Sequence, residues 1–168
     1  MTRLRLLLAI VIVVSTIGCD RVTKHIAVER LAGAPDRSLL ADTIRLEYAE
    51  NSGAFLGLGA SLPAPAKIAI FVVGNGVVLL FLAVEFVRRR WTGAAFAGTV
   101  LFIAGGASNL IDRIAHGRVV DFLNVGVGPL RTGIFNVADV AVMLGVALVV
   151  IAGIGRAPEP PAPADLPV

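Results

Sequence analysis

Two aspartates carry the strongest indication of catalysis in this sequence. Asp121 lies in Arg118-Val-Val-Asp121-Phe-Leu, and Asp139 lies in Phe135-Asn-Val-Ala-Asp139, where a long apolar run begins. Each has a simple structural explanation when it is considered alone. Asp121 is explained as a loop acid paired with Arg118, and Asp139 as a helix-start carboxylate stabilised by the helix macrodipole.

The two carboxylates together have a chemistry that neither has alone. When two carboxyl groups lie close together near a low-dielectric boundary, both cannot ionise easily, so one stays protonated and the other acts as a base. Such a pair can activate water for attack on an amide carbonyl and then protonate the leaving amine. Sequence spacing does not establish that Asp121 and Asp139 are close, so the aspartate pair is a hypothesis that depends on the surrounding elements.

Further charged residues lie near the ends of the same apolar runs. Asp20 and Lys24 are four residues apart, which predicts a helical ion pair. Asp112 and Arg113 follow a glycine-containing apolar run, and we interpret them mainly as structural ion-pair partners. Charged groups at a membrane boundary are costly and usually have a function. The sequence therefore places a polar site at one membrane face.

Three asparagines are candidates for supporting that site. Asn109 lies three residues before Asp112, so the two share a helix face. Asn51 and Asn136 lie near turns, where an amide can orient a substrate backbone or simply stabilise the turn.

The composition of the chain indicates that it lies partly in lipid. Of the 168 residues, 57% are hydrophobic and only 16% are charged, and the mean hydropathy is +0.86. A soluble domain carries about a quarter charged residues, so lipid must be part of the solvent here. The net charge of +3 does not indicate nucleic acid, because the arginines flank apolar runs, where positive charge orients helices and meets anionic lipid.

Four apolar runs predict an all-α polytopic membrane protein with four transmembrane helices. A spanning helix needs about 20 mainly apolar residues, so the first and third runs should extend into their polar flanks. The runs cover about 4–19, 66–87, 94–110 and 137–154. Arginines precede the first run, fill the link between the second and third, and follow the fourth: Arg3, Arg5, Arg88, Arg89, Arg90 and Arg156. The positive-inside rule then predicts that both termini are cytoplasmic and that segments 20–65 and 114–136 lie outside.

The outer segments predict a small extracytoplasmic β-sheet. Residues 43–48 alternate apolar and polar side chains, which is strand periodicity, and a turn signal follows at 51–53, so a β segment is expected at about 40–60. The glycine-rich segment 114–136 predicts turns with a short hairpin. Residues 1–156 are expected to form one domain, and the Pro/Ala-rich residues 157–168 a disordered cytoplasmic tail.

Several other chemistries are disfavoured. Cys19 is the only cysteine, so an internal disulfide is excluded, and no zinc-binding spacing, phosphate-binding loop or dinucleotide fingerprint occurs. Ser108 and His116 lie close in sequence, but no G-x-S-x-G motif supports a serine mechanism. No metal or organic cofactor is expected.

Five blocks in this order resemble the lipoprotein signal peptidase family, also called signal peptidase II. The resemblance covers the chain from the first apolar run through the fourth and excludes the tail. The blocks are Asp20-Arg-Val-Thr-Lys24, Asn51-Ser-Gly-Ala-Phe55, Gly105-Gly-Ala-Ser-Asn109-Leu-Ile-Asp112-Arg113, Val119-Val-Asp121-Phe122 and Phe135-Asn136-Val-Ala-Asp139. One departure is Ser108, where the family often has glycine.

The resemblance implies an aspartic endopeptidase of the bacterial inner membrane. Such enzymes cut the signal peptide from prolipoproteins just before a cysteine that already carries diacylglycerol. Asp121 and Asp139 fall on the catalytic positions of the family. The other matching positions would support the site or the substrate: Asp20, Lys24, Asn51, Asn109, Asp112, Arg113 and Asn136. The expected partners are the diacylglyceryl-prolipoprotein and membrane lipid, with no nucleic acid, and the chain is expected to be a monomer.

Two other functional classes are compatible with a chain of this composition. A non-enzymatic membrane scaffold predicts that Cys19 is lipidated and that both aspartates are dispensable. A small proton-coupled transporter component predicts acids in the middle of the spans, whereas the middles here are nearly free of charge and Asn75 is their main polar interruption. For the peptidase, the extended cleavage region of a substrate could also pair with a strand edge near Leu46–Tyr48.

Overall fold

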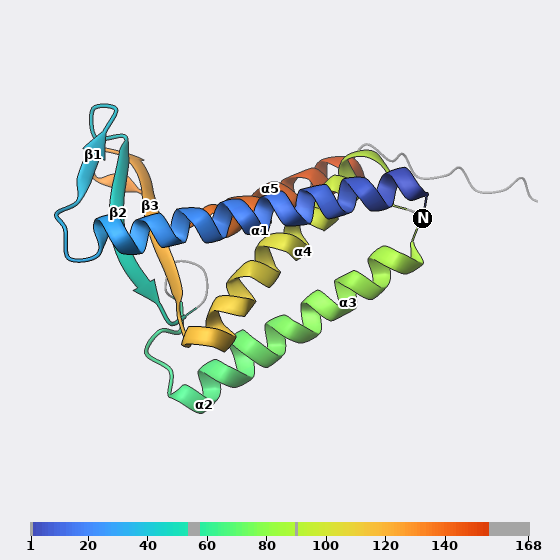
Figure 1. The fold of residues 1–168 in the computed structure, drawn as a ribbon, viewed down its shortest axis with the longest axis horizontal. Helices are drawn as coiled ribbons and strands as arrows, with labels where there is room; N and C mark the ends of the chain where they lie inside the picture. The colour runs from blue at the N-terminus through green and yellow to red at the C-terminus, as the bar shows by residue number, and fades with distance from the viewer. Residues whose placement is uncertain (1, 54–57, 90, 155–168) are drawn as a thin grey trace, which may run out of the picture.

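The computed structural model describes residues 2–53, 58–89 and 91–154. Long helices run side by side, and a small sheet lies at one end of them (Figure 1). The helices are α1 (Arg3–Leu31), α2 (Ala64–Lys67), the π-helical turn η2 (Ile68–Gly74), α3 (Asn75–Arg88), α4 (Gly93–His116) and α5 (Val137–Ile154). The strands are β1 (Arg37–Leu39), β2 (Ile44–Asn51), β3 (Val119–Val127) and β4 (Leu130–Arg131).

Four helices are long and apolar enough to cross a membrane, which confirms the predicted number of spans within the described residues. The second span is continuous from α2 through η2 to α3. The first and third spans extend through their charged flanks, as their short apolar runs required. Because α1 has 29 residues and a helix rises about 1.5 Å per residue, α1 is about 43 Å long and exceeds the roughly 30 Å hydrocarbon layer.

Helix α4 is the centre of the bundle and packs against α1, α3 and α5. Small residues bring α4 and α5 together: a Cβ atom on Gly98 would lie 2.6 Å from the carbonyl oxygen of Gly145. On another face of α4, a Cβ atom on Gly106 would lie 2.7 Å from the side chain of Leu79 in α3. Larger residues at these positions would push the helices apart, so the glycines fix how closely α4 approaches its neighbours.

The sheet has the order β1-β2-β3-β4 with antiparallel pairing throughout. The predicted strand at 43–48 is confirmed as part of β2, and the predicted hairpin in 114–136 is formed by β3 and β4. Gly117 adopts a left-handed conformation (φ 70°) that ends α4 and turns the chain into β3. The sheet packs on the end of α1 through a small core of Ala27, Leu31 and Phe122.

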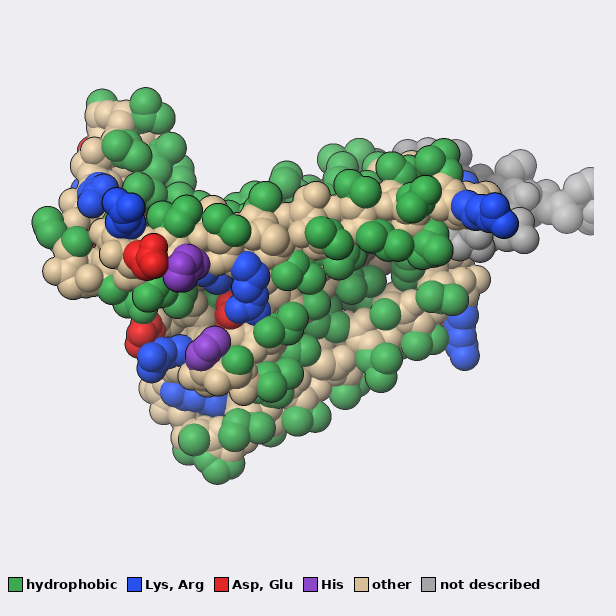
Figure 2. Space-filling view, in the orientation of Figure 1, with side chains coloured by type: hydrophobic (Ala, Val, Ile, Leu, Met, Phe, Trp, Pro, Cys, Tyr) green, Lys and Arg blue, Asp and Glu red, His purple; other side chains and the backbone are tan. Residues whose placement is uncertain are grey.

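Hydrophobic side chains cover the outside of the helices between two charged ends, as Figure 2 shows. Such a surface suits lipid rather than water. Arg3, Arg5, Arg88 and Arg89 lie at the ends of helices away from the sheet. Arg90, Arg156 and the predicted tail 157–168 lie outside the described residues.

Candidate active site

The first turn of α5 holds Asp139 in a reciprocal cap. Asn136 precedes the helix, and its Oδ1 accepts a hydrogen bond of 3.0 Å from the backbone N–H of Asp139. In return, Asp139 Oδ2 accepts the backbone N–H of Asn136 at 3.2 Å. This is the capping-box arrangement, with Asp in the position usually held by Glu or Gln. Asp139 therefore does lie at the start of a helix, as its simple explanation states. The cap also fixes the orientation of its carboxylate.

The same asparagine reaches the second aspartate. Asn136 is fully buried, and its Nδ2 donates a hydrogen bond of 2.6 Å to Asp121 Oδ1. Asp121 Oδ2 accepts another of 2.9 Å from Asn51 Nδ2, at the end of β2. The residue that caps Asp139 thus also binds Asp121, which joins the two aspartates in one hydrogen-bond network.

Asp121 lies on a strand rather than in a loop, which corrects the simple explanation of this residue. It is the third residue of β3, opposite Ala49 of β2. Arg118 does not pair with it and instead forms an ion pair with Glu50. Strand pairing points the Asp121 carboxyl inward, where only 3% of the residue is exposed.

Burial raises the pKa of the Asp121 carboxyl above its ordinary value. Hydrogen bonds from Asn51 and Asn136, and the positive charges of Lys24 and Arg113, act in the opposite direction but are outweighed. A carboxyl group with a raised pKa holds a proton more readily, as one member of an acid–base pair must.

A buried ion cluster around Lys24 is connected to the two aspartates. Lys24 Nζ contacts Asp20 Oδ2 and Asp112 Oδ2, both at 2.7 Å, and donates to Asn109 Oδ1 at 2.8 Å. Asn109 links the cluster to Asp139, because its Nδ2 donates a hydrogen bond of 2.9 Å to Asp139 Oδ1. The predicted pair of Asp20 and Lys24 is confirmed, but it is buried between helices instead of lying at a solvated helix end.

Asp20 ties this cluster to the first turn of α5. It is fully buried, and its Oδ1 accepts the backbone N–H of Ala138 at 2.9 Å. Its Oδ2 accepts a hydrogen bond of 2.7 Å from Ser108 Oγ. Asp20 therefore satisfies a free N–H group of α5 from a neighbouring helix, adjacent to the N–H group that Asn136 caps.

Arg113 connects α4 to the segment that follows β2. Its Nη2 donates to the carbonyl oxygen of Gly53 at 2.6 Å, and its Nη1 donates to that of Asn109 at 3.3 Å. Its charge acts on both Asp121 and Asp139. Asp112 pairs with Lys24 and Arg21 on α1, so the predicted ion pairing of Asp112 is confirmed, and its role at the site stays a prediction.

A groove of about 630 Å³ opens beside Asp139 between α3, α4 and α5. Its polar end is formed by Asp139, Asn109, Arg113 and Asn75. The rest of its wall is apolar and comes mostly from α5, with Val142, Met143, Val146, Ala147 and Val150. In the described part of the chain, no group of three or more His, Cys, Asp or Glu residues is placed to hold a metal ion.

The fold has known counterparts. A solved bacterial membrane enzyme, determined by the in meso method at 2.3 Å resolution, matches with a TM-score of 0.75 and 26% sequence identity over 90% of this chain and 93% of that chain. The family of signal peptidase (SPase) II matches residues 12–154. This chain belongs to that family.

Individual signal peptidase II relatives match over most of their length. The lipoprotein signal peptidase of Halothermothrix orenii is 32% identical over 141 residues, which cover 84% of this chain and 91% of the relative. That of Mycobacterium leprae is 34% identical over 159 residues, covering 90% and 73%.

All the signal peptidase II positions that the sequence analysis selected belong to one connected network in the structure. They are Asp20, Lys24, Asn51, Asn109, Asp112, Arg113, Asp121, Asn136 and Asp139. Sequence reasoning missed two members: Ser108 as the partner of Asp20, and Arg21 as the partner of Asp112. Ser108 was visible as a hydroxyl next to Asn109 on an apolar helix, but nothing local indicated a partner on α1. Ala54 and Phe55, which end the second sequence block, lie outside the described residues.

Proposed function

We propose that this protein removes the signal peptide from diacylglyceryl-modified prolipoproteins, cutting just before the lipidated cysteine, and that Asp121 and Asp139 are its catalytic pair. The observation that carries the assignment of residues is the position of Asn136, which hydrogen-bonds Asp121 through its side chain and caps Asp139. Family membership supports an aspartic peptidase over the scaffold or transporter alternatives.

The reaction needs one proton shared between two carboxyl groups. The ionised carboxylate removes a proton from water as the water oxygen bonds to the carbonyl carbon of the scissile peptide. The protonated carboxyl donates a hydrogen bond to the carbonyl oxygen, and a proton then passes to the leaving nitrogen as the C–N bond breaks. Because coupled carboxyls titrate as a pair, the proton belongs to Asp121 and Asp139 together.

The groove beside Asp139 is suited to an apolar substrate. A signal peptide is an apolar segment within the bilayer, and the apolar wall from α5 offers it a complementary surface. The polar end of the groove brings the peptide bond to Asp139, Asn109 and Arg113. The polar end lies where the helices meet the sheet, which supports chemistry near the membrane surface, where water is available.

The free edge of β2 supports a binding mode for the extended cleavage region. Strand β1 pairs with Ile44–Leu46 only, so among the described residues the edge from Glu47 to Glu50 has no strand beside it. This shifts the expected pairing site away from Leu46, which pairs with Arg37, and toward Tyr48–Glu50, which lead to Asn51 beside Asp121. A substrate strand on this edge would gain backbone hydrogen bonds close to the catalytic pair.

The membrane placement follows from the same proposal. We infer a location in the bacterial inner membrane with both termini in the cytoplasm and the sheet and active site on the outer face. The arginines at the helix ends opposite the sheet support this orientation. One chain contains every residue of the proposed site, so the protein is expected to work as a monomer.

The function is tested with purified protein and a diacylglyceryl-modified prolipoprotein. Mass spectrometry of the products should show a single cut immediately before the lipidated cysteine. The same precursor without diacylglycerol is the control and should be cut far more slowly. Absence of cleavage of the modified precursor by folded protein would contradict the proposal.

A further inference from the structure

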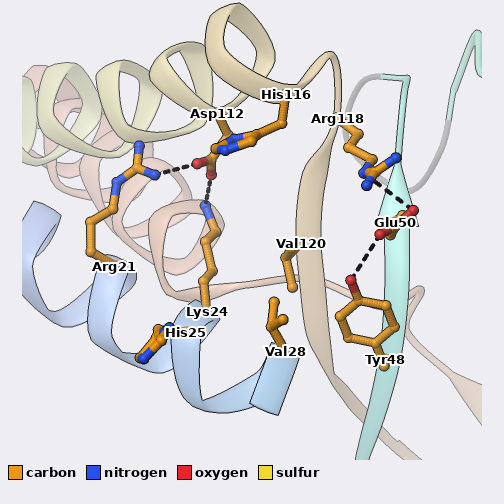
Figure 3. Close-up of a pocket in the computed structure, with 10 residues that line it drawn as sticks. All are labelled: Arg21, Lys24, His25, Val28, Tyr48, Glu50, Asp112, His116, Arg118 and Val120. Carbon is orange, nitrogen blue, oxygen red and sulfur yellow. Dashed lines mark hydrogen bonds and ion pairs between the residues drawn. The ribbon is translucent and has the colours of Figure 1, made fainter. Parts of the chain in front are cut away.

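A second cavity lies on the sheet end of the molecule, between α1, the end of α4 and strands β2 and β3 (Figure 3). Its volume is about 430 Å³. It shares no lining residue with the groove beside Asp139. Its polar lining contains Arg21, Lys24, His25, Asp112, His116 and Arg118. Several nitrogen-bearing side chains therefore surround one space that the peptidase chemistry does not use.

The acids of this cavity are already occupied. Asp112 accepts hydrogen bonds from Lys24 and from Arg21. Glu50 accepts a hydrogen bond of 2.9 Å from the Tyr48 hydroxyl and pairs with Arg118 at 3.2 Å. Figure 3 shows these interactions lining the walls of the cavity. A ligand entering the cavity therefore meets carboxylates that are already neutralised.

The arginines, in contrast, have donors to spare. The side chains of Arg21 and Arg118 are 35% and 53% exposed. Each guanidinium carries five N–H donors. The contact of Arg118 with Glu50 engages Nε, and the contacts of Arg21 with Asp112 and Ser108 engage one hydrogen on each terminal nitrogen. His116 and His25, whose Nε2 already contacts Glu29 at 3.2 Å, are exposed beside them. The cavity is thus equipped to bind an oxyanion through charge-assisted hydrogen bonds.

The position of the cavity along α1 indicates which oxyanion would be available to it in a membrane. About 20 residues of α1 are enough to cross the hydrocarbon layer, so its last third projects into the headgroup layer. His25 lies in that last third, and Arg21 immediately precedes it. Lipid phosphates occupy this layer at high local concentration, and basic residues there attract anionic lipids.

The surface below the cavity is suited to acyl chains. Gly18 and Val14 lie three and seven residues before Arg21, so they are on the same face of α1. Val14 is exposed, and no atom lies within 4 Å of where a Cβ atom on Gly18 would be. Figure 2 shows hydrophobic side chains along the helices on this face, to the right of the charged cluster at the sheet end.

We propose that this cavity binds the headgroup of an anionic glycerophospholipid, with Arg21 and Arg118, which line opposite sides of it, as its main cationic contacts. The site is distinct from the substrate's lipid, because a diacylglyceryl group on cysteine has no phosphate. Its occupant would therefore be a resident lipid that associates with α1 and α4 on the side away from the Asp139 groove. The inference does not depend on the peptidase activity.

Native mass spectrometry of detergent-purified protein tests the proposal, with phosphatidylglycerol and zwitterionic phosphatidylcholine as the probes. The wild type should bind phosphatidylglycerol about tenfold more tightly than phosphatidylcholine. The double variant Arg21→Gln/Arg118→Gln should lose this preference, with about tenfold weaker binding of phosphatidylglycerol. Arg118→Gln alone should weaken binding of phosphatidylglycerol several-fold. Because Arg118 is the more exposed of the two arginines, this single variant tests the site even if the double variant misfolds.

Arg45→Gln is the matched control, because it removes one positive charge from β2 outside this cavity and should leave the affinity within about twofold of the wild type. Equal binding of the two lipids, or an equal loss in Arg45→Gln and Arg118→Gln, would overturn the site. Inorganic phosphate at millimolar concentration should not displace the lipid. If it displaces phosphatidylglycerol completely, the cavity is a soluble-anion site and the lipid assignment is wrong.

Discussion

The Nδ2 atom of Asn136 lies 2.6 Å from Asp121 Oδ1, while the Oδ1 atom of the same residue caps the backbone N–H of Asp139. One buried amide therefore sets the position of both proposed catalytic carboxylates. Neither of its hydrogen bonds can be replaced by water without opening the packed core, because Asn136 is fully buried.

The two roles of Asn136 can be separated by substitution. Serine keeps a helix-capping oxygen but is too short to reach Asp121, whereas alanine removes both functions. We expect Asn136→Ser and Asn136→Ala both to lower kcat by at least about tenfold, and Asn136→Ala to be less stable than Asn136→Ser by about 1 kcal/mol. Cleavage kinetics and thermal unfolding in detergent check this. Full activity of Asn136→Ser would show that the contact with Asp121 is unimportant.

Ser108 is predicted to stabilise the buried ion cluster. Its Oγ donates to Asp20 Oδ2, and neither residue is exposed. Ser108→Ala leaves one acceptor site of a buried carboxylate without its hydroxyl partner, which costs about 1–3 kcal/mol. The melting temperature in detergent should therefore fall in Ser108→Ala.

The control for this prediction is Ser15→Ala on the exposed face of α1, which should have no measurable effect. Equal melting temperatures of Ser108→Ala and the wild type would mean that Lys24 and the Ala138 N–H satisfy Asp20 without help. Ser108→Gly would add the cost of a glycine in a helix interior, so alanine is the cleaner substitution.

The raised pKa of Asp121 predicts a pH dependence of stability. The folded state holds this proton more tightly than the unfolded state, whose carboxyl has the ordinary pKa of 3.8. The stabilising contribution of the protonated form is therefore complete below about pH 4 and is lost as the pH rises through the folded-state pKa. Thermal unfolding of the wild type between pH 4 and 7 should show this loss, and Asp121→Asn should remove that part of the slope.

Asp36→Asn is the control for the pH experiment, because Asp36 is exposed on the loop before β1 and should leave the slope unchanged. A slope that is identical in the wild type and Asp121→Asn would contradict the raised pKa. A steeper loss of stability with rising pH in Asp121→Asn than in the wild type would mean that the pKa of Asp121 is lowered, not raised.

The sequence predicted those parts of the fold that depend on local pattern. The lengths of the apolar runs located all four spans, and the shortness of the first and third correctly indicated that α1 and α4 continue through their charged flanks. Alternating side chains located β2, and the glycine-rich segment located the hairpin of β3 and β4.

The parts that sequence reasoning did not reach are contacts between distant elements. The simple explanation of Asp121 as a loop acid paired with Arg118 is wrong, because pairing of β3 with β2 places Asp121 on a strand and Arg118 pairs with Glu50. Ser108 and Asp20 are 88 residues apart in the chain. Periodicity describes which face of an element a residue occupies, whereas the partner on that face is set by helix packing, here by the glycine-mediated approach of α4 to its neighbours.

The central claim is that both aspartates are needed for cleavage. Asn is nearly the same shape as Asp but cannot act as a base or carry the shared proton. Purified Asp121→Asn and Asp139→Asn should each cut a diacylglyceryl-modified prolipoprotein at least about a hundredfold more slowly than the wild type, while unfolding within a few degrees of it. Near-normal cleavage by either folded variant would show that the aspartate pair is not the catalytic centre.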